Sequence, residues 1–71
     1  KPSGSFIQQY KISSREEEVI NYLINGLSNK EIGEKMFISL STVKTHVHNI
    51  YEKTHTGSRF KLIKLLNSSS Y

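Results

Sequence analysis

The feature that constrains this chain most is a pair of short helical segments with almost nothing between them. Residues 29–36 and 40–53 carry apolar residues at helical spacing, and only three residues separate them. A connection this short forces two consecutive helices to cross sharply, as in a helix-turn-helix. Gly33 lies inside the first segment, where glycine costs about 1 kcal/mol relative to alanine. We therefore expect another part of the chain, most simply the second helix, to pass close to Gly33.

The apolar positions around this short connection support the same interpretation. Counted from Asn29, the small residue Gly33 is fifth, and apolar residues are fourth, eighth, tenth and fifteenth. These apolar residues are Ile32, Met36, Ile38 and Val43. This pattern lets the two helices cross closely and pack on a third. By itself it is moderately specific, because other helical proteins can contain it by chance.

Capping signals organise the rest of the chain. Ser13 with Glu16 and Ser28 with Glu31 have the spacing of capping boxes at helix starts. The chain is predicted to be all-α, with four helices at about 14–25, 29–36, 40–53 and 59–67. We expect residues 1–10 to be a linker, residues 11–67 to be the folded domain and residues 68–71 to be a tail. Because the chain starts at Lys1 rather than at methionine, we interpret it as a fragment of a longer protein.

Size and composition argue against several function classes. A chain of 71 residues buries only about 60% of the surface that its unfolded form exposes, which disfavours a walled catalytic cleft. It has no cysteine, no apolar run of membrane-spanning length and no signal-peptide pattern. His46, His48 and His55 do not group like zinc ligands. No nucleophile–base pair or phosphate loop can be assembled, so we expect no enzyme activity, cofactor, metal or membrane partner.

Charge is distributed unevenly along the chain. Residues 1–34 carry four basic and five acidic side chains, whereas residues 35–71 carry six basic and one acidic. A basic half suggests a polyanionic partner. Ordinary solubilising charge is an equally good explanation of this asymmetry alone.

The outer face of the predicted helix 40–53 favours a polyanionic partner over ordinary solubilising charge. At about 100° per residue, Val43, Val47 and Ile50 cluster on one side. The opposite side presents Ser41, Lys44, Thr45 and His48. No acid interrupts this stripe before Glu52, although a merely solvated helix face usually mixes both signs of charge. The stripe suits the major groove of DNA, which is wide enough to admit a helix.

Several segments of the chain carry a family resemblance: SSRE at 13–16, EVI at 18–20, GLSNKEI at 26–32, IS at 38–39 and TVKTHV at 42–47. Together they closely resemble the LuxR-type helix-turn-helix domain over about residues 12–66. That family is four-helical, binds DNA as a dimer and commonly forms the C-terminal output domain of bacterial response regulators and quorum-sensing receptors. The resemblance implies a cytoplasmic, nucleoid-associated bacterial transcription regulator that binds specific double-stranded promoter or operator DNA.

The resemblance also implies roles for individual residues. The positions that face bases correspond to Lys44, Thr45 and His48. Phosphate contacts are expected from Lys30, Thr42, Ser41, Asn49 and Lys53. Dimerisation is expected through the last helix, at Phe60, Ile63, Lys64 and Asn67. The alternative for Phe60 is that its ring folds back onto Tyr51 or the tail. In the full-length protein, a receiver or ligand-binding domain upstream and a contact with RNA polymerase are further expectations.

Some positions depart from the family pattern. Phe37 stands where glycine or a small polar residue is common, and we expect its ring to cover the core. Thr54 and Thr56 replace apolar residues, which predicts looser packing where the last two helices meet. His46 is expected to be a partly buried structural residue.

The rival hypothesis for the whole chain is a helix-turn-helix that has lost DNA binding and docks a polymerase subunit or a receiver domain.

Overall fold

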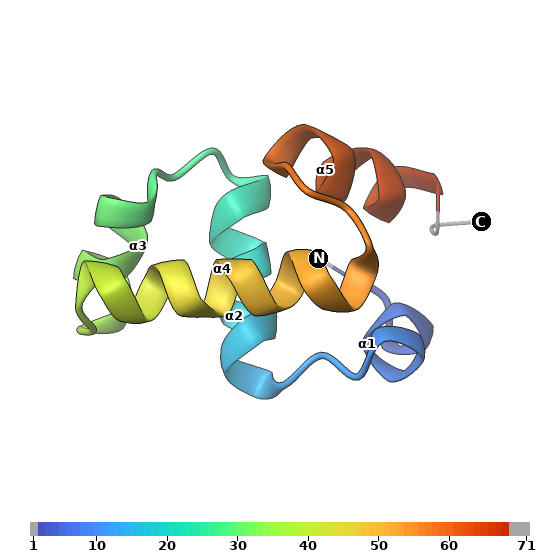
Figure 1. Cartoon of the computed structure of the whole chain (residues 1–71), viewed down its shortest axis with the longest axis horizontal. Helices are drawn as coiled ribbons and strands as arrows, with labels where there is room; N and C mark the ends of the chain where they lie inside the picture. The colour runs from blue at the N-terminus through green and yellow to red at the C-terminus, as the bar shows by residue number, and fades with distance from the viewer. Residues whose placement is uncertain (1, 69–71) are drawn as a thin grey trace.

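The described part of the chain folds into five helices that pack around one core (Figure 1). The computed structural model describes residues 2–68, which contain helices and turns but no strand. The helices are α1 (Gly4–Tyr10), α2 (Ser14–Ile24), α3 (Asn29–Met36), α4 (Leu40–Thr54) and α5 (Arg59–Ser68). The predicted all-α class is confirmed, and the bounds of α2 to α5 lie within about a residue of the expected ones.

The helix starts are fixed by the serines that the sequence predicts. The Ser13 hydroxyl accepts from the Glu16 amide at 3.1 Å, and the Ser13 amide donates to Glu16 Oε1 at 2.9 Å. Ser28 and Glu31 form the same reciprocal pair at the start of α3. Both capping boxes are therefore present, and each satisfies amide groups that a helix leaves free at its N-terminus.

Helix α1 corrects the prediction that residues 1–10 form a linker. The Ser3 hydroxyl caps this helix by accepting from the Phe6 amide, and Phe6 is only 1% exposed. The Phe6 ring lies 4.8 Å from that of Tyr10, and Lys11 ends the helix in the left-handed conformation. The burial of Phe6 outweighs the low helix propensity of the surrounding serines and glycine. At the other terminus, Ser68 belongs to α5, and residues 69–71 of the predicted tail lie outside the described residues.

The core lies where α4 crosses α2 and α3 (Figure 1). Its fully buried aliphatic side chains come from four helices: Val19, Ile20, Leu23, Ile32, Val43, Ile50 and Leu62. Phe6 of α1 completes this cluster. Helix α4 thus buries one face along most of its length and leaves the opposite face free for another partner.

The turn between α3 and α4 explains why residue 33 is a glycine and why the Phe37 side chain is exposed. A Cβ atom at Gly33 would lie 2.9 Å from the Ile38 carbonyl oxygen and 3.5 Å from Val43 Cγ2. The expected close approach exists, but its nearest atom belongs to the turn rather than to the second helix. The expectation that Phe37 covers the core is wrong, because its side chain is 95% exposed. Phe37 ends α3 in the left-handed conformation, and the next residue, Ile38, packs on the core instead.

The junction between α4 and α5 is held by hydrogen bonds between polar groups. Thr54 is buried, and its hydroxyl donates to the Ile50 carbonyl oxygen at 2.8 Å and lies 2.9 Å from the Thr56 hydroxyl. Among the described residues, no buried side-chain polar atom lacks a hydrogen-bond partner. The two threonines therefore fit this junction through hydrogen bonds where the family more often uses apolar contacts.

Candidate nucleic-acid interface

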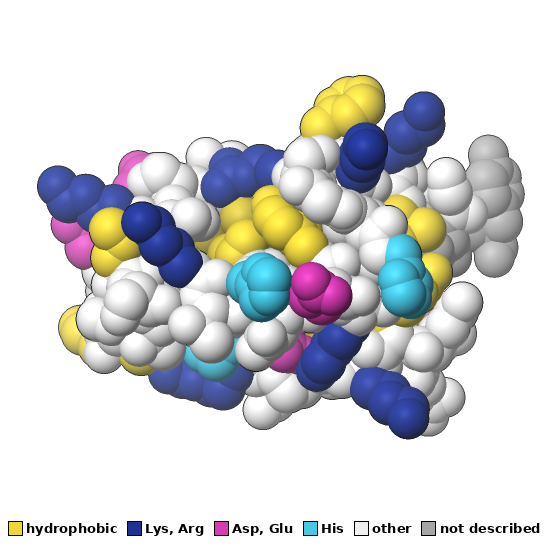
Figure 2. Space-filling view, viewed as in Figure 1, with side chains coloured by type: hydrophobic (Ala, Val, Ile, Leu, Met, Phe, Trp, Pro, Cys, Tyr) yellow, Lys and Arg dark blue, Asp and Glu magenta, His cyan; other side chains and the backbone are white. Residues whose placement is uncertain are grey.

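The candidate interface is the outer face of α4. The opposite face is held in the core by Val43, Val47 and Ile50. At about 100° per residue, this attachment directs the other side of the helix to solvent. Figure 2 views the molecule from this side, where basic and histidine side chains follow α4 and acidic side chains are few.

The three residues expected to face bases are all exposed on α4. Lys44, Thr45 and His48 lie within five consecutive positions. The Thr45 hydroxyl donates to the Ser41 carbonyl oxygen at 3.1 Å, which leaves its oxygen free to accept. His48 Nε2 lies 3.8 Å from Glu52 Oε1, one turn further along. A cation, a hydroxyl and an imidazole thus share one accessible surface.

The first turn of α4 gathers hydroxyl groups. The Ser39 hydroxyl accepts from the Thr42 amide and lies 2.9 Å from the Thr42 hydroxyl and 3.2 Å from the Ser41 hydroxyl. All three side chains are exposed, and they surround the positive end of the helix dipole. Lys30 and Asn49 are exposed as well, in the first turn of α3 and on α4 respectively. These residues can donate hydrogen bonds to phosphate oxygens.

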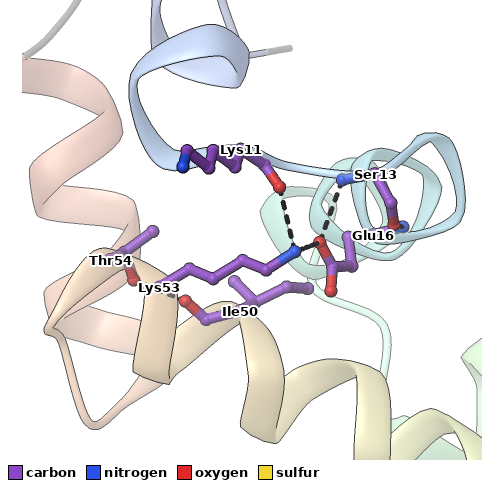
Figure 3. A network of polar contacts seen from close by, with 6 residues as sticks. All are labelled: Lys11, Ser13, Glu16, Ile50, Lys53 and Thr54. Atoms are coloured by element: carbon purple, nitrogen blue, oxygen red, sulfur yellow. Dashed lines mark hydrogen bonds and ion pairs between the residues drawn. The ribbon is translucent and has the colours of Figure 1, made fainter.

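Lys53 does not join this surface, although it was expected to contact phosphate. Its ammonium group lies 2.7 Å from Glu16 Oε1 and donates to the Lys11 carbonyl oxygen at 2.9 Å (Figure 3). The same carboxylate oxygen accepts from the Ser13 amide. Lys53 therefore ties the end of α4 to the loop between α1 and α2. No local pattern could have indicated this contact, because 37 positions separate Lys53 from Glu16.

The surroundings of Glu16 lower its pKa. Burial of the carboxyl group alone would raise the pKa, but hydrogen bonds from Lys53 and from the Ser13 amide, together with the charge of Lys53, outweigh burial. A lowered pKa in the folded state means that the ionised form stabilises the fold. That contribution is complete above the ordinary pKa of 4.5 and is lost as the pH falls through the lower folded-state value.

We expect Glu16→Gln to lower the free energy of unfolding by about 1–3 kcal/mol at neutral pH, because it removes a charge-assisted hydrogen bond to a buried group. The difference from the wild type should shrink as the pH falls below the ordinary pKa of 4.5 and through the lower folded-state pKa of Glu16, where its carboxyl group becomes neutral. Urea titrations across this pH range measure both effects. Glu18→Gln is the matched control, since Glu18 forms only an exposed pair with Arg15 at 3.1 Å and such pairs contribute about 0–1 kcal/mol. Equal losses in the two variants would contradict this role of Glu16.

Helix α5 exposes the residues expected at a dimer interface. Phe60 is 75% exposed, which does not fit the alternative of a ring folded back onto the domain. Ile63 is half-buried, whereas Lys64 and Asn67 are exposed. Leu62 of the same helix is fully buried and anchors α5 to the core. The four residues therefore lie on the side of α5 that the core leaves open.

Other kinds of site have little support in the structure. Within residues 2–68, no three potential metal-ligating side chains come together. His46 is half-buried on the flank of α4, as expected. None of the helices in this part of the chain has the length and apolar character needed to cross a membrane.

A short turn, a sharp crossing of α3 and α4 and an exposed polar face on α4 define a helix-turn-helix domain. Residues 11–66 match the GerE family, described as bacterial regulatory proteins of the luxR family. The chain belongs to this family of DNA-binding transcription regulators, which is not a family of enzymes. The predicted family resemblance is thereby confirmed.

Several curated relatives carry names of transcription regulators. The chain is 46% identical over 50 residues to the "Uncharacterized transcriptional regulatory protein YhcZ" of Bacillus subtilis. This matched segment covers 70% of this chain and 23% of that protein. It is 46% identical over 52 residues to the "Fimbriae Z protein" of Escherichia coli, covering 73% and 25%. It is 38% identical over 58 residues to the "CsgBAC operon transcriptional regulatory protein" of Escherichia coli, covering 82% and 27%. The chain thus spans about a quarter of the length of these relatives. No solved structure matches it significantly.

Proposed function

We propose that this domain binds specific double-stranded DNA by placing α4 in the major groove, as the output domain of a bacterial transcription regulator. The observation that carries the proposal is the outer face of α4, which exposes Lys44, Thr45 and His48 while the opposite face is buried. A helix of 15 residues is about 22 Å long, and the major groove is about 12 Å wide. The helix can therefore follow the groove for several base pairs.

Base and backbone contacts have different tasks in this proposal. Lys44, Thr45 and His48 supply sequence preference, because they reach donors and acceptors on base edges. Contacts with the phosphates of the DNA backbone set the position of α4 on the duplex. They come from the first turn of α3, the first turn of α4 and the middle of α4: Lys30, Ser41, Thr42 and Asn49. The helix dipoles at both N-termini favour phosphate in the same places.

We expect Lys44→Ala to weaken binding at a specific site by about 1–3 kcal/mol. Lys44 is exposed, so the substitution removes a DNA contact without disturbing the core. Fluorescence anisotropy on a duplex selected from a random library measures the loss. Lys35→Ala is the matched control, because Lys35 is also exposed but lies beside Arg15 and Tyr22 on the α2 side of the domain. If Lys44→Ala binds like the wild type at moderate salt, α4 is not the recognition helix.

We further propose that two copies pair through α5 on adjacent half-sites about one helical turn apart. The exposed Phe60 beside Ile63 supports this pairing, since large apolar side chains in contact with water favour a protein partner. Lys64 and Asn67 lie on the same side of the helix and form the polar rim of the interface.

Phe60→Ser should abolish cooperative binding to a duplex with two half-sites and leave binding to a single half-site unchanged. Phe60 is mostly exposed, so the fold should tolerate serine at this position. Phe37→Ser is the control, because Phe37 is at least as exposed and lies in the α3–α4 turn. Cooperativity that survives Phe60→Ser, or is lost equally in both variants, would contradict pairing through α5.

The remaining parts of the proposal concern the whole protein. Because the chain covers about a quarter of its relatives, we propose that a receiver or ligand-binding domain controls this one in a two-component or related system. RNA polymerase is a further proposed partner, and the bacterial cytoplasm at the nucleoid is the proposed location. A domain that binds no duplex DNA even at low salt would instead favour the protein-docking hypothesis.

A further inference from the structure

Leu40 is a large apolar side chain that is exposed at the start of α4. It is the first residue of α4, directly after the Ser39 cap. Its side chain is 44% exposed, and it is absent from the core cluster and from the half-buried residues that pack against it. The first turn of a helix favours polar or acidic residues, which complement the dipole. Leu40 therefore places an apolar group at the surface of α4, outside the core cluster.

The register of α4 places Leu40 beside the proposed base-reading residues. Leu40, Lys44 and His48 are spaced by four, so each is rotated by about 40° from the next along the helix. Leu40 lies at the N-terminal end of this row, on the margin between the outer face and the core. In a helix-turn-helix, the N-terminal residues of the recognition helix are the ones that contact base edges. The row therefore begins with an apolar group and continues with a cation and an imidazole.

The chemistry of the major groove offers one partner for an aliphatic side chain. Guanine, cytosine and adenine present only donors and acceptors there, whereas thymine also presents its 5-methyl group. A leucine can satisfy neither donors nor acceptors, and it would leave them unpaired in a dry contact. We propose that Leu40 is a specificity-determining residue that packs against a thymine 5-methyl group at one position of each half-site. This inference rests on the proposed function, because it assumes that α4 enters the major groove.

Removing single methyl groups from the DNA tests the contact directly. A site is selected from a random duplex library with the wild-type domain, and each thymine is then replaced in turn by uracil, which lacks only the 5-methyl group. Replacement of the contacted thymine in a single half-site should weaken wild-type binding by about fourfold, the effect of one buried methylene-sized group. The same replacement should leave Leu40→Ala binding unchanged. Phe37→Ala is the control and should keep the wild-type response, because Phe37 lies in the turn and outside the row.

The outcomes separate this inference from the proposed function. If the wild type selects a specific site but responds to no methyl removal, or if Leu40→Ala responds as strongly as the wild type, the role of Leu40 is overturned while DNA binding stands. If the wild type binds no duplex, both proposals fail. Loss of stability does not confuse the result, because alanine is a good helix former and the comparison is between two DNAs bound by the same variant. An unchanged melting temperature of Leu40→Ala confirms that its fold is intact.

Discussion

Replacing Ile50 by alanine is expected to lower the free energy of unfolding by about 2–5 kcal/mol, the range measured for buried aliphatic side chains. Ile50 is 0% exposed and belongs to the core cluster that α4 shares with α2, α3 and α5. The substitution removes buried methyl groups and leaves a cavity that the rigid crossing of these helices cannot fill by collapse. Native domains have only about 5–15 kcal/mol of stability in total, and a small domain lies near the lower end. Ile50→Ala should therefore be largely unfolded at moderate urea concentrations.

Urea titration followed by circular dichroism measures this loss. Ile63→Ala is the matched control, because it removes the same atoms from a half-buried position on α5. The control should lose less stability, since part of its side chain already contacts water. Equal losses in the two variants, or a loss below about 1 kcal/mol for Ile50→Ala, would contradict the core position of α4.

Local signals in the sequence predict most of this fold. The serine–glutamate capping boxes locate the starts of α2 and α3, because the groups involved are only three residues apart. Helical periodicity identifies Val43, Val47 and Ile50 as the buried side of α4 and leaves Lys44, Thr45 and His48 outside. These features depend on interactions within one or two helical turns, and such interactions can be recognised from spacing alone.

The features that the sequence does not reveal depend on distant contacts or on backbone conformation. Helix α1 is short and forms because Phe6 reaches a core built by residues far along the chain. Lys53 forms an ion pair with Glu16, which lies 37 positions earlier in the sequence. Phe37 turns outward because a left-handed residue ends α3, with φ at 57°. Apolar character predicts burial only where the backbone directs the side chain inward.

The affinity of this domain for DNA should fall steeply with salt. Each lysine that neutralises a phosphate releases condensed counterions, and the logarithm of affinity falls by about 0.9 per phosphate for each tenfold rise in salt. Lys30 is proposed to contact phosphate, and the exposed Lys44, which reads bases at a specific site, can neutralise a phosphate on random-sequence DNA, where no specific base contact forms. A pair of domains then neutralises about four phosphates, and affinity should fall by roughly 100-fold between about 50 and 200 mM salt.

The most direct test of DNA binding by the outer face of α4 is therefore a salt titration on random-sequence duplex DNA. Fluorescence anisotropy should show binding at low salt, with a linear log–log decline whose slope becomes less steep in Lys44→Ala and stays unchanged in Lys35→Ala. A wild-type domain that fails to bind at low salt, or that binds with an affinity independent of salt, would contradict the account.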